Sequence, residues 1–209
     1  MMSKGGRVYI GLTVLFALVC QTFLIRLEKG SIHLSMDAWH TNVDPTFFKY
    51  ITHLGDGLAF VAVVLILLAF RRRGAMVLSV VSTGVAVLLL VGVLKQVVFP
   101  GVDRPWGFFE EGALRIIPDL KQHTHNSFPS GHTTAAFALY GVLAFWFNRR
   151  WISVLLFLLA LTVGYSRIFL NQHFLIDVFV GSMLGTAIAW VNYWLFSKMT
   201  HPRMRDRLF

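Results

Sequence analysis

Residues 75–98 read AMVLSVVSTGVAVLLLVGVLKQVV, and Lys95 is the one charged residue in this run. A helix that crosses the hydrocarbon core of a bilayer needs about 20 predominantly apolar residues. The run therefore predicts a membrane-spanning helix. The composition of the whole chain agrees, because 56% of the 209 residues are apolar and 14% are charged. Soluble domains carry about 25% charged residues, so the composition excludes most soluble folds.

Five further apolar runs lie on either side of residues 75–98, and the six runs together predict an all-α, polytopic membrane protein. We expect six transmembrane helices within a single domain that covers residues 1–209. The other runs are Val8–Ile25, Gly57–Phe70, Thr133–Phe147, Trp151–Leu170 and Phe174–Phe196.

The first two runs allow more than one interpretation, the first as a signal peptide and the second as part of a longer helix. The first could be a signal peptide, but its 18 residues exceed the apolar core of about 7–15 residues that such peptides have, which favours a retained helix. The second run is short. Upstream of it, Asp44-Pro45 is typical of an N-cap followed by proline at the first helical position, so we expect that helix to begin near Pro45 and to lie partly in the interface.

The charges of the loops predict the orientation, because cytoplasmic loops carry an excess of Lys and Arg. With a cytoplasmic N-terminus, the inside segments hold eleven Lys and Arg against one Asp, and the outside segments hold eight against nine acids. The formal net charge of +9 thus divides into about +10 inside and −1 outside. We therefore expect both termini in the cytoplasm, and no nucleic acid is needed to explain the basic composition.

Three polar clusters stand at the ends of the predicted spans, and this topology places all of them on the outer side. Two long loops, residues 26–53 and 99–128, lie on the same side. The clusters are Lys95 with Asp103-Arg104-Pro105, the segment Asn126–His132, and Ser166-Arg167 with His173 and Asp177.

The side chains of these clusters suit phosphoryl transfer. Ser130 and Gly131 lie at the start of a predicted helix, where free N–H groups and the helix dipole favour an anion and a serine hydroxyl adds a donor. Positive charge would come from Lys95, Arg104 and Arg167, since Arg binds phosphate oxygens in a bidentate manner and Lys acts as a point charge.

Two histidines with different surroundings can share the chemistry. His173 and Asp177 are four residues apart, so on a helix they share a face. The carboxylate can hold one ring nitrogen and leave the other as a nucleophile, while His132 protonates the departing oxygen. No metal or cofactor is required, because the cations offset the charge on the phosphoryl oxygens. The pair His123 and His125 is weak evidence for a metal site.

These motifs resemble the signature of the type 2 phosphatidic acid phosphatase superfamily, which is Lys-x6-Arg-Pro, Pro-Ser-Gly-His and Ser-Arg-x5-His-x3-Asp. The second part stands at Pro129–His132, and the third runs from Ser166 to Asp177 without deviation. The first part departs, because eight residues instead of six separate Lys95 from Arg104. The turn Phe99-Pro100-Gly101 can absorb the extra pair.

The resemblance implies a role for each residue of the motifs. His173 would be the phosphohistidine nucleophile, Asp177 its orienting partner and His132 the general acid. The phosphate-binding residues would be Lys95, Arg104, Ser130, Gly131 and Arg167.

The resemblance also implies a substrate class and a location. The substrate would be a membrane lipid phosphate or diphosphate, cleaved without a metal ion, with undecaprenyl diphosphate and lipid A 1-phosphate favoured. The protein would be integral to a bacterial plasma (inner) membrane, with its active site facing outside or the periplasm. A lipid phosphotransferase that uses the same phosphohistidine and a non-enzymatic lipid carrier remain alternatives.

Overall fold

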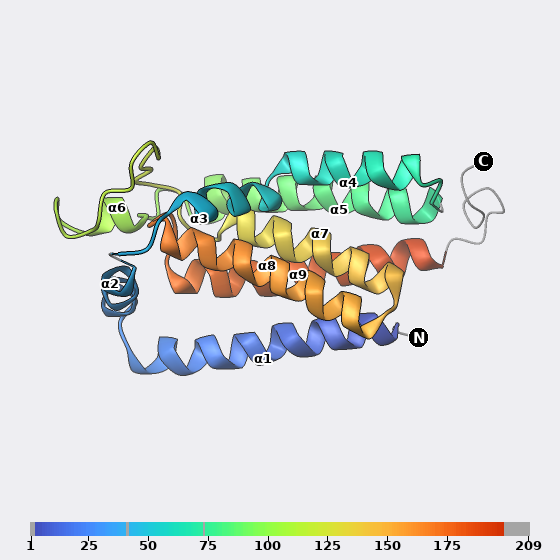
Figure 1. The fold of residues 1–209 in the computed structure, drawn as a ribbon, viewed down its shortest axis with the longest axis horizontal. Coiled ribbons are helices and arrows are strands. Elements are labelled where there is room, and N and C mark those ends of the chain that lie inside the picture. Colours follow the sequence, from blue (N-terminus) through green and yellow to red (C-terminus); the bar gives the residue numbers. More distant parts are fainter. Residues whose placement is uncertain (1–2, 41, 73, 199–209) are drawn as a thin grey trace.

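A computed structural model describes residues 3–40, 42–72 and 74–198, and this part of the chain is helical and contains no strand. The all-α prediction is confirmed for these residues. Long helices run side by side along one axis (Figure 1). The elements are α1 (Lys4–Arg26), α2 (Lys29–Trp39), α3 (Thr46–Ile51), the 3-10 helix η1 (Thr52–Gly55), α4 (Gly57–Ala69), α5 (Gly74–Val93), the π-helix η2 (Leu94–Val98), α6 (Pro105–Phe108), α7 (Gly131–Phe147), α8 (Arg150–Phe169) and α9 (Leu175–Ser197).

Each of the six apolar runs forms a helix. Within the described residues, four helices are long and apolar enough to cross a membrane, namely α1, α5 with η2, α8 and α9. A fifth span arises if the pair from α3 to α4, which is bent by 63°, crosses as one unit. α7 has 17 residues, at the lower limit of about 17–25 for a spanning helix. Six spans and cytoplasmic termini stay predictions.

The bend between α3 and α4 has a local cause. α3 begins at Thr46, and its N-cap position is held by Pro45 and not by Asp44 as the sequence predicts. Oδ1 of Asp44 accepts a hydrogen bond from the N–H of Thr46 at 2.8 Å, just before the helix. A side-chain N-cap stands at Asp56, whose Oδ1 accepts from the N–H of Leu58 at 3.0 Å. A new helix therefore starts within the segment, and the expected helix near Pro45 is divided in two.

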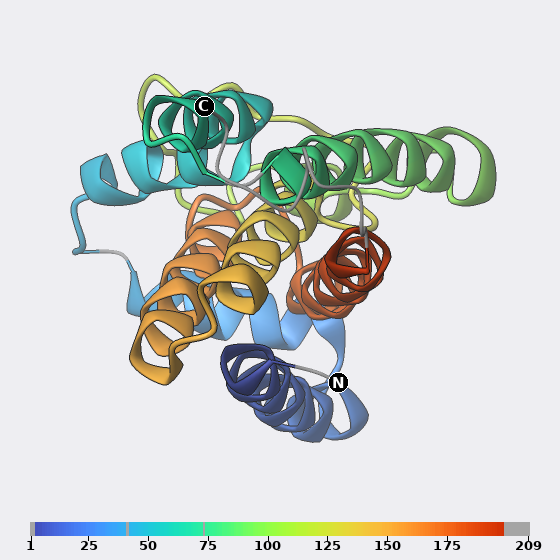
Figure 2. The same ribbon diagram turned by 90° about the vertical axis from the view of Figure 1, so that its right-hand side faces the viewer.

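α7 occupies the centre of the bundle and is buried from Thr133 to Phe145. It packs most extensively against α9 and α8, with α5 and α1 completing its surroundings (Figure 2). Gly181 and Gly185 lie one turn apart on α9 and permit close approach, as small residues do between membrane helices. A Cβ atom on Gly185 would clash with the carbonyl oxygen of Thr134. The backbones of α7 and α9 are therefore in near contact.

The two ends of the bundle differ in character. α1 begins and α9 ends at one end, where the turns carrying Arg72 and Arg149–Arg150 also lie, whereas α2 and α6 cover the opposite end (Figure 1). The basic turns therefore stand opposite the polar clusters. Arg73 and residues 199–209, which contribute to the predicted inside charge, fall outside the described residues.

α2 is a helix that the apolar pattern does not indicate. It has 11 residues and lies within the loop predicted for residues 26–53. Its buried residues include His33 and Asp37, so the inward face of this helix is largely polar.

Candidate active site

The three polar clusters meet at the end of the bundle that α2 and α6 cover. His173 lies at the centre of this site, in the short connection between α8 and α9, and is 1% exposed. Its Nδ1 lies 3.3 Å from Oδ2 of Asp177, which confirms the predicted contact. His173 precedes α9 instead of belonging to it. Asp177 reaches back past the helix start, where Oδ2 also accepts from the N–H of Phe174 at 3.0 Å.

Ser127 completes this pair, although the sequence motifs give it no role. Its hydroxyl donates a hydrogen bond to Oδ2 of Asp177 and lies 3.3 Å from Nδ1 of His173. Its own N–H donates to the carbonyl of Val102 at 2.9 Å. The sequence signal for Ser127 is its place in the polar cluster Asn126–His132, two residues before Pro129.

The geometry and the charges favour a neutral imidazole at His173. Burial, followed by the charges of Arg104, Arg167 and Lys95, holds the pKa of His173 well below its usual value. Within the described part of the chain, the hydrogen bonds of the ring all involve Nδ1. Nε2 is therefore the nitrogen available to a substrate.

Lys95 reaches the site despite the longer spacing of its motif. It lies in the π-helix η2, and its Nζ donates to the carbonyl of Asn126 at 2.9 Å. A π-helix accommodates additional residues in a helical segment and is frequent at functional sites. Gly101 then turns the chain with a φ of 72°, a conformation that glycine adopts readily. The two extra residues are accommodated between Lys95 and Arg104.

Arg104 binds the catalytic connection directly. Its Nη1 donates to the backbone carbonyl of Gln172 at 3.3 Å and to the side-chain Oε1 of Gln172 at 3.1 Å. Its Nε donates to the carbonyl of His125 at 2.9 Å. Arg104 thus contacts the residue that immediately precedes His173.

Arg167 is buried near the end of α8. Its Nη1 donates to Oγ1 of Thr52 at 2.7 Å, and Thr52 belongs to η1 at the bend before α4. Its buried Nε has no hydrogen-bond partner among the described residues. Buried donors without a partner are uncommon because they lose their interaction with water, so this N–H is a donor suited to an anionic ligand.

The start of α7 forms the remaining side of the site. Oγ of Ser130 accepts from the N–H of Thr133 at 3.4 Å and from its hydroxyl at 2.9 Å, which leaves the hydroxyl hydrogen of Ser130 for another acceptor. Gly131 and His132 are in the first turn, where N–H groups lack intrahelical partners. His132 lies within electrostatic reach of Arg167 and His173.

The two histidines of the weak metal fragment do not form a cluster. His125 pairs with Asp103, with Nδ1 and Oδ1 separated by 2.8 Å. Among the described residues, no group of three or more His, Cys, Asp or Glu side chains is arranged to hold a metal ion. The described residues thus give no second observation in favour of a metal site at His123 and His125, which lie in the loop that contacts Arg104.

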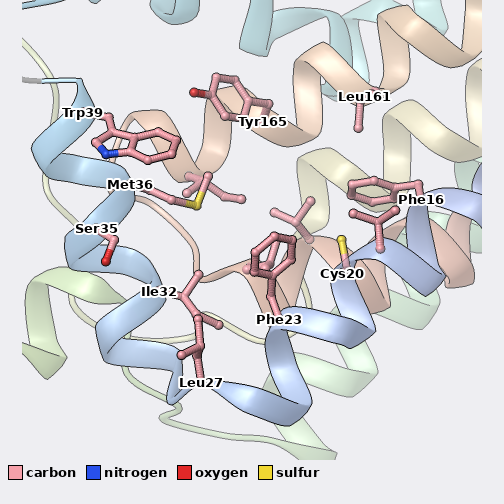
Figure 3. A pocket seen from close by; sticks show the side chains of 14 residues that line it. Phe16, Cys20, Phe23, Leu27, Ile32, Ser35, Met36, Trp39, Leu161 and Tyr165 are labelled. Atoms are coloured by element: carbon pink, nitrogen blue, oxygen red, sulfur yellow. The ribbon is translucent and has the colours of Figure 1, made fainter.

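An apolar cavity of about 420 Å³ lies between α1, α2, α8 and α9 (Figure 3). Phe23 from α1, Met36 from α2 and Leu161 from α8 line it, and the thiol of Cys20 faces it. None of the predicted phosphate-binding residues lines this cavity. It is thus distinct from the polar site around His173.

Comparisons with known proteins place this bundle among helical lipid phosphatases. LpxE of Aquifex aeolicus has a crystal structure that superposes with a TM-score of 0.61 at 25% identity, over 78% of this chain and 92% of that one. The PAP2-type phosphatidylglycerolphosphate phosphatase of Bacillus subtilis shares the fold, with a TM-score of 0.64 at 22% identity. The model of the PAP2 superfamily matches residues 74–200. The chain belongs to the PAP2 superfamily.

Relatives by sequence carry the names of phosphatases. Undecaprenyl-diphosphatase BcrC of Bacillus subtilis is 32% identical over 168 residues, which cover 78% of this chain and 80% of that protein. Lipid A 4'-phosphatase of Bacteroides thetaiotaomicron is 34% identical over 79 residues, which cover 38% of this chain and 35% of that protein. The match to lipid A 1-phosphatase of Porphyromonas gingivalis covers 16% of that protein. These names support the predicted class of enzyme, a phosphoric ester hydrolase.

Proposed function

We propose that this chain is a metal-independent lipid phosphate or diphosphate phosphatase that works through a phosphohistidine at His173. The observation that carries the proposal is the environment of this histidine. Asp177 and Ser127 hold Nδ1, and Lys95, Arg104 and Arg167 act on the ring with their positive charges. A neutral nucleophile surrounded by cations suits a phosphoryl group, whose transfer is catalysed mainly by positioning and by charge stabilisation.

In the first step, Nε2 of His173 attacks phosphorus while the bond from phosphorus to the lipid oxygen breaks. His132 gives its proton to the departing oxygen, so the lipid leaves as an alcohol, or as a monophosphate when the substrate is a diphosphate. Asp177 stabilises the positive charge that develops on the imidazole. The phosphoryl oxygens take hydrogen bonds from the three cations and from the start of α7.

In the second step, water attacks the phosphohistidine. His132, now neutral, accepts a proton from the water, and the bond between phosphorus and Nε2 breaks. Inorganic phosphate leaves, and His173 returns to its neutral state. Atoms and charges balance over the cycle, because the proton that His132 donates in the first step is replaced by a proton from water in the second.

We further propose six spans, with both termini cytoplasmic and His173 at the outer face of a bacterial plasma (inner) membrane. The excess of basic residues in the predicted inside loops supports this orientation. The 17 residues of α7 reach about 26 Å at 1.5 Å per residue, so a slightly thin bilayer accommodates them.

The apolar tail of the substrate would stay in the hydrocarbon region beside α5. Val93 of α5 and Val97 of η2 are exposed and each stand two residues from Lys95, so on the helix they face away from the lysine. This apolar face can contact hydrocarbon, while Lys95 turns inward to the carbonyl of Asn126. Such an approach lets the headgroup reach the site while the tail remains among lipids.

Two lipids are the first candidates for the substrate. The match to undecaprenyl-diphosphatase BcrC, which covers most of both chains, supports undecaprenyl diphosphate. The similarity to LpxE and to the lipid A phosphatases supports lipid A 1-phosphate. A panel of lipids separates these candidates from phosphatidic acid and phosphatidylglycerol phosphate.

The test uses purified protein in detergent, this panel of lipids, excess EDTA, and the variants His173→Ala and His132→Ala. We expect phosphate release in the presence of EDTA, and its loss in His173→Ala. With ³²P-labelled substrate, the parent protein should become labelled and His173→Ala should not, and His132→Ala should slow both steps because it removes the acid of the first and the base of the second. Glu111→Gln, at an exposed position, is the matched control.

Three results would overturn parts of this assignment. Full phosphate release by His173→Ala would exclude the phosphohistidine. Complete loss of activity with EDTA would exclude a metal-independent reaction. Transfer of label to a second lipid in preference to water would identify a phosphotransferase, and the absence of any turnover over the whole panel would leave a lipid carrier.

A further inference from the structure

A second buried polar cluster lies next to the site, on the inward face of α2. Asp37 is its centre and is 7% exposed. Oδ1 of Asp37 accepts from Nδ2 of Asn171 at 2.9 Å and from Nε of Arg115 at 3.2 Å, and Oδ2 accepts from the N–H of Arg115 at 3.0 Å. Three segments far apart in the sequence therefore meet at one carboxylate.

The two remaining guanidinium nitrogens of Arg115, Nη1 and Nη2, also donate hydrogen bonds to these segments. Nη1 donates to the carbonyl of His40, just after α2, at 2.8 Å. Nη2 donates to the carbonyl of Phe169, the last residue of α8, at 2.7 Å. The guanidinium also lies 4.4 Å from the centroid of the Phe169 ring. Arg115 thus joins α2 to the end of α8.

Asn171 is the point at which this cluster contacts the catalytic connection. Its backbone is left-handed, with a φ of 54°, a conformation that asparagine tolerates better than most residues. Its Oδ1 lies 3.0 Å from Nε2 of His33 on α2, and its Nδ2 also donates to the carbonyl of Arg115 at 3.4 Å. Both ends of the amide are therefore held.

Asn171 stands two residues before His173, and the backbone between them is tightly folded. The N–H groups of Gln172 and His173 both donate to the carbonyl of Arg167, at 3.0 and 3.1 Å. Backbone bonds thus anchor this turn to α8, and the amide of Asn171 anchors it to α2 and Arg115. Because the turn is fixed on both sides, a displacement of Asn171 is expected to displace His173 as well.

We propose that Asp37, acting through Arg115 and Asn171, positions His173 for its attack on phosphorus. Asp37, Arg115 and Asn171 are positioning residues and do not touch the substrate. This inference rests on the proposed function, because it assigns a role in the reaction of His173. It also explains why α2 presents polar residues to the interior next to the site of His173.

A buried charge of this kind is sensitive to the loss of a single partner. Removing one member of a buried pair leaves the other uncompensated, which is strongly destabilising, whereas the intact pair adds little net stability. A purely structural role predicts fewer correctly folded molecules with normal turnover in each. A positioning role predicts folded molecules whose individual turnover is slow, because a misplacement of about 1 Å can reduce the rate about 100-fold.

The test compares Asp37→Asn, Asn171→Asp and the double variant that exchanges the two side chains. The substrate is the lipid of the panel that the parent protein hydrolyses fastest. Active sites are counted as folded molecules, from the monodisperse fraction in size-exclusion chromatography and the amplitude of thermal unfolding in detergent. Asn171→Gly preserves the left-handed backbone and removes the amide. Glu111→Gln is the acidic control, since Glu111 is exposed and makes no ion pair or side-chain hydrogen bond within the described residues.

We expect each single variant to lower kcat per active site about 10- to 100-fold while KM stays close to the parent value. The exchanged pair should recover about tenfold of this loss, the coupling expected of residues in direct contact. Asn171→Gly should resemble Asn171→Asp. Glu111→Gln should match the parent protein.

The possible outcomes separate the two proposals. The cluster would have only a structural role if Asp37→Asn and Asn171→Gly had fewer active sites but a normal kcat in each of them. Absence of recovery in the exchanged pair would show that the two side chains act independently. A parent protein whose turnover does not depend on His173 would instead overturn the proposed function, whatever the Asp37 variants do.

Discussion

The hydroxyl of Ser127 donates a hydrogen bond to Oδ2 of Asp177, across 50 positions of the sequence. The same carboxylate oxygen faces Nδ1 of His173. Ser127 therefore fixes the direction in which the carboxylate points, and through it the orientation of the imidazole. It connects the segment before Pro129 to the first turn of α9.

Replacing Ser127 by alanine should slow the reaction. The buried carboxylate would lose one of its donors, at a cost of about 1–3 kcal/mol, and part of this loss falls on the transition state. We expect kcat to decrease by between a few-fold and about 100-fold, since each 1.4 kcal/mol corresponds to a factor of ten. Ser35→Ala is the control, because among the described residues the Ser35 hydroxyl bonds only to the carbonyl of Ser31 in its own helix. An unchanged kcat in Ser127→Ala would mean that Asp177 is held without it.

Arg167→Lys should weaken catalysis even though the charge is kept. A lysine places one point charge where arginine offers a planar array of donors, so it cannot both bond to Thr52 and present Nε. We expect kcat/KM to fall about 100-fold or more, the usual cost of losing a donor to a charged transition state. Steady-state kinetics measure this loss. Arg150→Lys, at the start of α8 and at the opposite end of the bundle, should retain the parent activity.

The pH dependence should report the environment of His173. Burial, and then the charge of Arg104, lower its pKa, and the neutral imidazole is the reactive form. Activity should therefore rise with pH through a value below the ordinary 6.5 and be retained in mildly acidic solution. In Arg104→Gln the pKa of His173 should rise, which moves the acid limb of kcat/KM to higher pH. The ionisation of the substrate is common to both proteins, so coincident limbs would contradict this expectation.

Gly185 should tolerate no larger side chain. A Cβ atom there would meet the backbone of α7 at Thr134, and overpacking of a tight core costs about 1–3 kcal/mol. We expect Gly185→Ala to lower the midpoint of thermal unfolding in detergent. Gly92→Ala on α5 is the matched control, because a Cβ atom at Gly92 meets no neighbour within 4 Å. It should leave the midpoint unchanged or raise it.

Cysteine labelling tests the topology. Cys20 is the only cysteine of the chain and is 3% exposed, so the parent protein should give little background. A membrane-impermeant maleimide added outside intact cells should label Glu111→Cys and leave Arg72→Cys unlabelled until the cells are lysed. The reverse pattern would invert the proposed orientation.

The apolar helices could be predicted closely because burial in a bilayer demands long apolar runs. All six runs form helices with ends within about four residues of the expected ones, an ordinary error for sequence patterns. α2 escaped prediction because its buried residues His33 and Asp37 are polar, so its inward face lacks an apolar stripe. The break between η1 and α4 could not be predicted, because it depends on whether Asp56 caps a new helix or continues the preceding one.

Part of the candidate site could likewise be predicted from the sequence and part could not. His173, Asp177 and the three cations could be named because their residue types and spacing suit phosphoryl transfer. No role could be assigned to Ser127, Asp37 or Arg115, since residues of α2 and of the connecting segments acquire their roles only when distant segments meet. For the longer spacing after Lys95, the turn Phe99-Pro100-Gly101 could be predicted from its residues, whereas the π-helix Leu94–Val98 could not.

The contact between Arg104 and Gln172 has a consequence for turnover. The two bonds that Gln172 accepts occupy Nη1 of Arg104, and Nε donates to the carbonyl of His125. Within the described residues Nη2 has no such partner, so a phosphate can bind there while the rest of the guanidinium stays fixed. The side chain therefore keeps its orientation when inorganic phosphate departs, and it is ready for the next substrate.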